Sequence, residues 1–344
     1  MNHEYYIKRC LEISKKGIGT TRPNPSVGAV LVVDDKIVGE GCTSPYGGNH
    51  AEVNAISSIN NNEDLQKATI YVTLEPCSHF GKTPPCADLI VKSGIKKVVI
   101  GCLDVNEIVA GRGVERLRNG GCEVVVGVLE NECKAHHKRF FTFHSKKRPY
   151  IILKWAQTQD GYIAPKERVK QDPVWITKKT SRQLVHKWRS EEHSILVGTT
   201  TVLHDNPSLN VRSWKGKNPL RIVIDKDLRI PKDLNVYDGS VKTIFINQKV
   251  TSRNDNFYFE KINFSGPIAS QICEVLYKHK VQSLIVEGGG KTIQTFIDES
   301  LWDEARVFTG TMLFKKGTKA PILDVPFLHE EKLIGDSLKT YVND

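Results

Sequence analysis

The sequence predicts an α/β protein of two domains, and three observations lead to that prediction. The chain has 344 residues, which at ~150 residues per domain suggests two domains. Short apolar segments of strand length alternate with helical patterns through both halves of the chain. A polar, basic segment over residues 134–149 lies between the halves, which share no repeat. We therefore expect one domain over residues 1–145 and a second over residues 146–344.

The first domain opens with a helix whose apolar residues include Tyr5, Ile7, Leu11 and Ile13. Runs rich in valine and isoleucine predict strands, and longer mixed runs predict helices. We expect strands over residues 29–33, 36–42, 69–74, 96–102 and 122–129, and helices over 50–59, 86–94 and 113–121. The Lys/Arg-rich segment 134–149, which ends at Pro149, is interpreted as a solvated linker.

The second domain repeats the alternation with its own apolar strands. We expect strands over residues 149–156, 193–198, 220–225, 241–247 and 283–289, with a last strand over 305–313. Helices are expected over 177–191 and 269–280, and after the glycines at 288–290. Thr177 is the expected N-cap of the first of these helices, because a threonine hydroxyl can accept an unpaired backbone N–H there.

Composition places the chain among ordinary globular proteins, with 26% charged, 39% hydrophobic and 8% aromatic residues. The longest apolar run, residues 27–33, is far shorter than the ~18 residues that a membrane span requires. The first ten residues contain no apolar stretch of the kind found in secretory signals. We therefore expect a cytoplasmic protein without a membrane partner, in which the eight cysteines stay reduced.

The net charge of +10 is concentrated in the second half of the chain. Residues 1–145 contain 17 Lys and Arg against 16 Asp and Glu, and the remainder contains 32 against 23. A basic half indicates anionic partners, either nucleic acid or small molecules with several phosphates. Charge alone does not choose between these two classes of partner.

The residues that indicate chemistry in the first half are His50, Glu52, Cys77 and Cys86. One imidazole and two thiolates suit zinc and leave a fourth position for water, as in catalytic sites. Both cysteines lie where a helix could start, and Glu52 is the carboxylate available as general base. His50 and Glu52 would be about 200° apart on a regular helix, so they can converge only at a helix entry. His79 as a fourth ligand would instead make the zinc site structural.

The motif H-x-E followed by Pro-Cys and a second Cys is a signature of zinc-dependent base deaminases. The stretch TLEPCSHFGKTPPC closely resembles the family of bifunctional riboflavin-biosynthesis deaminase/reductases, and RPNPSVGAV and VAGRG are similar to it as well. The resemblance covers essentially the whole chain. It implies a cytidine-deaminase-like domain with one zinc ion, held by His50, Cys77 and Cys86, and with Glu52 as the catalytic residue. Asn24 and Lys82 are candidate substrate contacts.

The resemblance also implies a dihydrofolate-reductase-like second domain that uses NADPH. Residue by residue, it implies cofactor contacts at Ala156, Trp175, Thr201, Asp205, Gly289, Gly290, Lys291, Thr292, Ile293, Gln294 and Thr295. It implies substrate contacts at Arg189, Leu209, Arg212 and Glu287. The residues agree with this in part, because two guanidiniums suit a phosphate and an indole can stack on a flat ring. The glycine turn is not G-x-G-x-x-G, so a Rossmann fingerprint is not supported.

Four positions depart from the family pattern and affect expected substrate contacts: Thr43, Asn49, Glu107 and Pro173.

The resemblance implies deamination of 2,5-diamino-6-(5-phosphoribosylamino)pyrimidin-4-one, followed by reduction of 5-amino-6-(5-phosphoribosylamino)uracil to the ribitylamino compound. We expect these phosphorylated pyrimidines as partners, a homo-oligomer, and no nucleic acid. Two alternatives are a tRNA or nucleoside deaminase, and a structural zinc in a nucleic-acid-binding protein.

Overall fold

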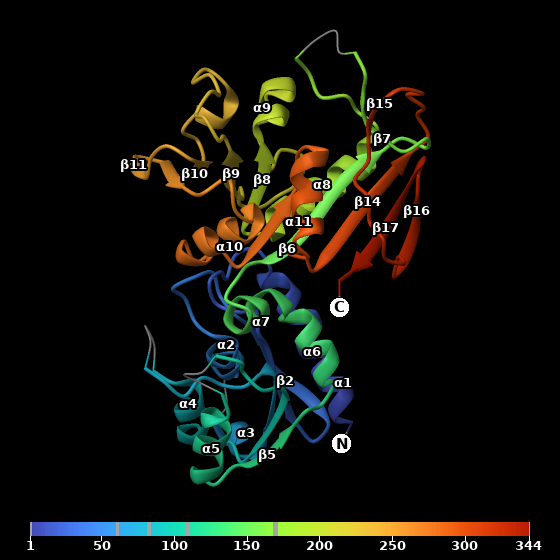
Figure 1. Cartoon of the computed structure of the whole chain (residues 1–344). Coiled ribbons are helices and arrows are strands. Elements are labelled where there is room, and N and C mark those ends of the chain that lie inside the picture. The colour runs from blue at the N-terminus through green and yellow to red at the C-terminus, as the bar shows by residue number, and fades with distance from the viewer. Residues whose placement is uncertain (1, 60–61, 81–83, 107–109, 168–170, 344) are drawn as a thin grey trace. The chain divides into compact units, whose positions relative to one another are not determined.

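The chain divides into two compact units, Met1–Lys147 and Arg148–Asp344, and each is described by itself. The computed structural model describes residues 2–59, 62–80, 84–106, 110–167 and 171–343. Both units are α/β, as the sequence predicts (Figure 1). The division falls two residues after the boundary that we placed from the sequence.

The first unit is built on a five-stranded sheet of order β2-β1-β3-β4-β5. Its strands are β1 (Gly28–Val33), β2 (Lys36–Cys42), β3 (Thr69–Leu74), β4 (Lys97–Cys102) and β5 (Glu123–Val126). β1 pairs antiparallel with β2 and β3, whereas β3, β4 and β5 are parallel. All six residues of β3 are buried, as expected for a central strand covered on both faces.

Seven α-helices accompany this sheet among the described residues: α1 (His3–Ser14), α2 (Ala51–Ser57), α3 (Asn62–Lys67), α4 (Cys86–Lys92), α5 (Arg112–Asn119), α6 (Glu130–His136) and α7 (Lys138–Ser145). The helices predicted from apolar periodicity are confirmed. The linker prediction for residues 134–149 is wrong, because this segment holds the end of α6 and all of α7. Phe140 is buried in the core of the first unit, and Phe143 one turn later is buried as well. The lysines and arginines occupy the other faces of these helices.

The second unit contains a ten-stranded sheet of order β11-β12-β10-β9-β8-β13-β6-β14-β17-β16. The strands from β12 to β14 in this order are parallel to one another, and both edges are antiparallel. Their bounds are β6 (Tyr150–Gln157), β8 (Ser194–Gly198), β9 (Leu220–Ile224), β10 (Thr243–Asn247), β11 (Ser252–Asn254), β12 (Phe257–Lys261), β13 (Ser283–Val286), β14 (Glu304–Gly310), β16 (His329–Leu333) and β17 (Asp336–Val342). A separate pair joins β7 (Tyr162–Pro165) to β15 (Gly317–Lys319). The prediction of a last strand at 305–313 is wrong, since three strands follow β14.

Helices cover both faces of the large sheet, and the alternation of side chains along the strands explains how. Leu196 packs with α10 (Ile268–Lys278) and α11 (Gly290–Asp298), whereas its neighbours Ile195 and Val197 pack with α8 (Lys179–Glu191) and α9 (Thr199–Asp205). Successive strand residues point to opposite faces. Each inner strand is therefore apolar on both faces, which is why these strands are continuous apolar runs in the sequence.

The prediction that Thr177 is the N-cap of α8 is wrong. The helix begins at Lys179, its N-cap position is Lys178 rather than Thr177, and no local side chain caps it. The Asp336 carboxylate at the start of β17 accepts the Lys178 backbone N–H at 2.8 Å and the Ser181 hydroxyl at 2.5 Å. A carboxylate that is remote in sequence therefore does the work of an N-cap.

Every helix within the described residues is too short or too polar to cross a membrane.

Candidate functional site

His50 is placed by the close packing of α2 on β2. A Cβ atom on Gly41 of β2 would lie 2.3 Å from the Ala51 carbonyl oxygen, so the helix can lie this close only because residue 41 has no side chain. His50 itself is the extended N-cap residue of α2, and Glu52 lies in the first turn. The expectation that these two side chains can converge only at a helix entry is confirmed.

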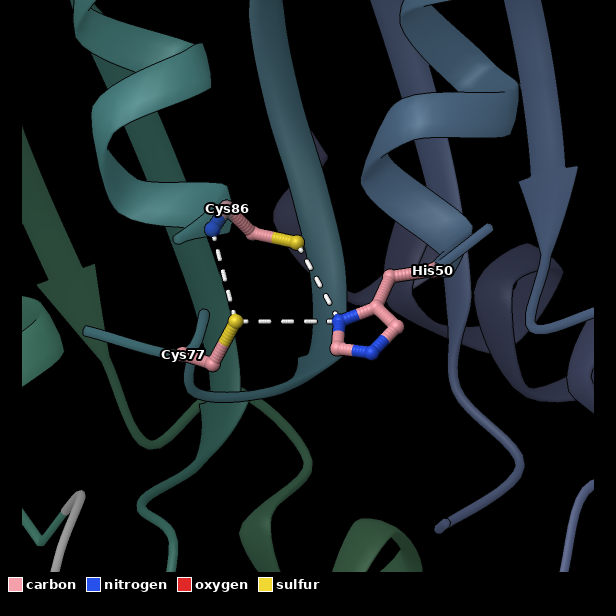
Figure 2. Close-up of side chains that lie close together, drawn as sticks. All are labelled: His50, Cys77 and Cys86. Atoms are coloured by element: carbon pink, nitrogen blue, oxygen red, sulfur yellow. Dashed lines mark hydrogen bonds between the residues drawn. The ribbon is translucent and has the colours of Figure 1, made fainter. Parts of the chain in front are cut away.

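His50, Cys77 and Cys86 come together although they lie on three separate segments. Figure 2 shows the His50 ring and the two sulfurs facing one another from the start of α2, the segment after β3 and the first residue of α4. His50 Nδ1 lies 3.3 Å from Cys86 Sγ and 3.6 Å from Cys77 Sγ. All three candidate ligand atoms lie within 4.8 Å of one another.

The two cysteines reach this cluster differently. Cys86 begins α4, as expected, but the same expectation is wrong for Cys77, which lies in an irregular segment. The Cys77 sulfur nevertheless accepts the Cys86 backbone N–H at 3.3 Å. Hydrogen bonds from the Cys86 thiol and from His50 hold the pKa of the Cys77 thiol well below its usual value. Cys77 is thus held in an environment that favours the thiolate, the form that binds a metal.

The donor set fits zinc. One imidazole nitrogen and two sulfurs are ligands that zinc takes readily, and three protein ligands are typical of catalytic rather than structural zinc sites. His79, the alternative fourth ligand, is exposed and is not part of the cluster. Among the described residues no other His, Cys, Asp or Glu joins the three. The arrangement therefore favours a site with an open coordination position.

Glu52 is a buried carboxyl beside this cluster, with 4% of its surface exposed. Burial, reinforced by the nearby Cys77, raises its pKa to about 7. Its side chain forms a hydrogen bond with Cys86. A carboxyl group placed in this way can exchange protons with a small molecule bound beside the three ligands.

The other predicted positions of the first unit have different surroundings. Thr43, a departure from the family pattern, is buried, and its hydroxyl accepts the Val27 backbone N–H at 3.0 Å. Asn24 is partly exposed and Asn49 is exposed. Lys82 and Glu107 lie outside the described residues.

In the second unit, several predicted cofactor residues gather at the carboxyl ends of β6, β13 and β8, which are adjacent parallel strands. Ala156 lies near the end of β6, Thr201 in α9 after β8, and Gly289 after β13. A Cβ on Gly289 would lie 3.5 Å from Thr201 Oγ1. Ligands of open α/β sheets bind at such strand ends. Gly289 has a φ of 72° and is the N-cap residue of α11, a conformation that glycine adopts without strain.

The predicted cofactor residues 290–295 all belong to α11, and their side chains have different surroundings. Gly290, Lys291 and Thr292 form the first turn of α11, where backbone N–H groups are free of helical partners. Ile293 is 1% exposed and belongs to the core. Within the helix, Thr295 donates to the Lys291 carbonyl oxygen, and the Gln294 side chain is engaged by Asp298 and by the Ile322 N–H.

Trp175 and Asp205 are the last two predicted cofactor residues. Trp175 is 54% exposed, and the Arg182 guanidinium carbon lies 4.3 Å from the centre of its ring. Asp205 is the last residue of α9. Pro173, where the family commonly has serine, is partly exposed two residues before the tryptophan.

Arg189 and Glu287, two predicted substrate contacts, form an ion pair. Arg189 Nη2 lies 2.7 Å from Glu287 Oε2, and Nε lies 3.3 Å from Oε1. Burial opposes ionisation of Glu287, but Arg189 and then Lys154 outweigh it and hold the pKa at about 2. Lys154 Nζ lies 3.9 Å from the same carboxylate. Sequence reasoning missed Lys154, although a lysine inside the apolar strand YIILKWA was a signal.

Arg212 joins this group through His186, a second residue that sequence reasoning missed. His186 Nδ1 accepts the Arg212 backbone N–H at 3.2 Å, and Arg212 Nη1 donates to Asn210 Oδ1 at 2.6 Å. Burial, Arg189 and Arg212 lower the pKa of His186 to about 4. Leu209 is 2% exposed and has a φ of 51°. The available signal was the spacing of His186 and Arg189, one turn apart on α8.

Family comparisons match both units. Residues 149–341 match the family described as the RibD C-terminal domain, and residues 1–102 match the cytidine and deoxycytidylate deaminase zinc-binding region. The match of the first unit indicates a zinc-binding deaminase rather than a nucleic-acid-binding protein with a structural zinc, and the match of the second unit to a RibD domain favours the bifunctional family over a tRNA or nucleoside deaminase.

Relatives extend over nearly the whole chain. The riboflavin biosynthesis protein RibD of Aquifex aeolicus is 40% identical over 330 residues, which is 94% of this chain and 91% of that protein. RibD of Bacillus amyloliquefaciens is 37% identical over 361 residues, or 98% and 95% of the two chains. A solved structure from Thermotoga maritima, described as a diaminohydroxyphosphoribosylaminopyrimidine deaminase/5-amino-6-(5-phosphoribosylamino)uracil reductase, has a TM-score of 0.90 and 39% identity and covers 99% of each chain. The chain therefore belongs to the RibD family of bifunctional riboflavin-biosynthesis proteins, in which a zinc-binding deaminase region is joined to a reductase that uses NADPH.

Proposed function

We propose that residues 1–145 hydrolyse the 2-amino group of 2,5-diamino-6-(5-phosphoribosylamino)pyrimidin-4-one and release ammonia. Residues 146–344 then reduce the ribosyl group of 5-amino-6-(5-phosphoribosylamino)uracil to a ribityl group. The observation that carries this proposal is the His50–Cys77–Cys86 cluster with the buried Glu52 beside it, in one chain with a RibD reductase domain. The substrates are those that the description of the Thermotoga maritima protein names, and that protein covers 99% of this chain.

In the deaminase unit, His50, Cys77 and Cys86 would hold one zinc ion. When bound, zinc supplies Lewis acidity and lowers the pKa of a coordinated water. Glu52 is the general base and acid, which accepts a proton from the attacking water and delivers it to the leaving amine. Its place in the first turn of α2, two residues after a ligand and sealed from bulk solvent, supports this role.

In the reductase unit, the strand ends and the first turn of α11 receive NADPH. The glycines allow backbone atoms to approach the cofactor, and the free N–H groups of the helix start suit its phosphates. Contacts from Ala156, Trp175, Thr201, Asp205 and residues 289–295 belong to this proposal. The ribosyl group accepts a hydride from NADPH and a proton, which yields the open-chain ribityl group and NADP⁺.

The group formed by Arg189, Arg212 and Glu287 receives the phosphorylated substrate, with Leu209 beside it. Guanidiniums recognise phosphate oxygens by directed, charge-assisted hydrogen bonds. Two phosphorylated ligands account for the basic second half, so a nucleic-acid partner is not needed. We further propose that the protein is a homo-oligomer in the cytoplasm. Light scattering of the purified chain tests the oligomeric state.

Mass spectrometry of the diaminopyrimidine incubated with the zinc-loaded protein tests the proposed function. Without NADPH, the expected product has one amino group replaced by oxygen and an intact ribosyl group. With NADPH, the product also gains two hydrogens. Unchanged substrate under both conditions would contradict the assignment of the first unit, and a deaminated product that NADPH does not change would contradict that of the second.

A further inference from the structure

Cys77 is the one proposed zinc ligand that lies outside a helix and outside a helix cap. Residues 75–78 follow β3 without regular secondary structure. A metal site nevertheless needs each ligand held within about 0.5 Å of its working position. Much of what fixes this segment comes from α5, a helix that contributes no ligand.

Glu75 makes the most extensive of these contacts. The residue is 4% exposed, and its carboxylate accepts three backbone N–H groups from a distant segment. Oε2 accepts from Asp104 at 3.2 Å and from Gly111 at 3.0 Å, and Oε1 accepts from Val114 at 3.0 Å. Gly111 is the N-cap residue of α5 and offers no side chain for capping. Glu75 therefore satisfies the start of α5 from outside the helix.

Two more residues of α5 contact the same segment. A Cβ on Gly113 would lie 2.1 Å from the Pro76 carbonyl oxygen, so the helix backbone lies directly against residue 76. Arg116 Nη1 donates to the Ser78 carbonyl oxygen at 2.7 Å, and the same guanidinium pairs with Asp88 of α4. The helix thus contacts the chain on both sides of Cys77, and Arg116 links it to the helix that begins with Cys86.

We propose that Glu75 is a positioning residue for the deaminase metal centre, and that its carboxylate sets the place of Cys77 by fixing residues 75–78 to the start of α5. The inference rests on the proposed zinc ligands. His50 and Cys86 are placed by α2 and α4. Cys77 depends on the attachment to α5 and on two backbone N–H groups at the start of α4: that of Ala87, which the Cys77 carbonyl oxygen accepts, and that of Cys86, which the Cys77 sulfur accepts.

Glutamine cannot take over this role, although it has the volume of glutamate. Three N–H donors converge on both carboxylate oxygens of Glu75. In Glu75→Gln, one of these two positions becomes an NH₂ group, which cannot accept a hydrogen bond. At least one bond is lost and two donors are brought face to face, so the segment must shift. The apolar contacts of α5 and the whole second unit stay unchanged.

The test compares zinc-loaded full-length Glu75→Gln with the wild-type chain and with Glu115→Gln. Glu115 is an exposed acid in the first turn of α5, so its variant removes the same charge from the same helix end without touching residues 75–78. The measurements are the rate of zinc transfer to a colorimetric chelator, kcat and KM for ammonia release, and NADPH oxidation with the deaminated intermediate.

Glu75→Gln is expected to release zinc about 10- to 100-fold faster and to lose a similar factor in kcat, the range found for groups that orient metal ligands. KM for the pyrimidine and the reductase rate should stay at wild-type values, and Glu115→Gln should match wild type throughout. Arg116→Gln should show a smaller acceleration of zinc release. Wild-type zinc release and kcat in Glu75→Gln would overturn the inference, as would a parallel loss of both activities.

Two further variants separate the possible failures. If Glu75→Gln does not fold, Arg116→Gln decides, because unchanged zinc release in that variant would overturn the inference and faster release would support it. Cys77→Ser measured in parallel tests the ligand set itself. Retention of zinc by Cys77→Ser would contradict the proposed ligand set and, with it, this inference. Loss of zinc there, with wild-type behaviour of Glu75→Gln, would remove only the positioning role.

Discussion

Arg189 of α8 donates two hydrogen bonds to Glu287, which follows β13, with the shorter at 2.7 Å. A third, from Nη1 to the Asn210 carbonyl oxygen at 3.3 Å, occupies another part of the guanidinium. Most of the Arg189 donors are therefore committed within the protein. Arg212 is exposed, and within the described residues its guanidinium makes one hydrogen bond, from Nη1 to Asn210 Oδ1. It is therefore the guanidinium that can turn toward a phosphate more readily.

Arg212→Ala is accordingly expected to raise the reductase KM for the phosphorylated intermediate. A charge-assisted contact contributes roughly 1.5–3 kcal/mol, which corresponds to about a ten- to hundredfold increase. Arg212→Lys should recover part of this, because one ammonium cannot reproduce the guanidinium fork. Lys217→Ala, an exposed cation five residues later, is the matched control and should leave KM unchanged. An unchanged KM in Arg212→Ala would contradict the phosphate assignment.

His186 predicts a pH dependence of stability in the second unit. Its pKa is lowered to about 4 in the folded chain from an ordinary value of 6.5, so between these values the unfolded chain binds the proton more strongly. Its contribution to the free energy of unfolding therefore declines as pH falls from about 6.5 toward 4. His186→Gln should remove that decline and show a smaller loss of stability over this interval.

Tryptophan fluorescence is a selective probe for this measurement. All five tryptophans, Trp155, Trp175, Trp188, Trp214 and Trp302, belong to the second unit. Urea midpoints of wild type and His186→Gln at several pH values between 7.5 and 4.5 then compare the same unit. Parallel curves for the two proteins would show that His186 does not carry the effect.

Zinc removal should separate the two activities. After dialysis against a chelator, ammonia release should be lost and NADPH oxidation with the deaminated intermediate should be nearly intact. The reason is that the one candidate metal cluster within the described residues belongs to the first unit. Re-addition of zinc should restore ammonia release. Parallel loss of both activities would mean that the two units do not work as separate catalysts.

The fold and the candidate site could be predicted from the sequence wherever a local pattern determines the structure. Apolar runs such as residues 69–74 became central strands at the predicted positions, and His50, Cys77 and Cys86 met as their residue types indicated. Weak patterns were missed for a physical reason. β17 alternates buried Asp336 and Leu338 with half-buried polar residues, and its pairing with β14 determines the strand more than its own composition does.

Contacts between distant residues could not be predicted in the same way. Thr177 was a reasonable N-cap by residue type, but Asp336, 158 residues after Lys178, takes that role. Glu75 accepts backbone N–H groups at the start of α5, and Glu299 accepts two at the start of α10. Both residues act from outside the helix, as Asp336 does. A single sequence carries no signal for such partners, because any exposed or buried acid could serve. The positions of Lys154 and His186 beside the proposed substrate contacts depend in the same way on the packed fold.

Glu52→Gln tests the central claim most directly, with zinc content, ammonia release and NADPH oxidation measured on one preparation. The account predicts about one zinc per chain, a loss of ammonia release of at least ~10²–10⁴-fold, as expected for a general acid and base, and a wild-type reductase rate. Wild-type ammonia release in Glu52→Gln would contradict the proposed mechanism, and loss of zinc would show that Glu52 holds the metal or the fold instead.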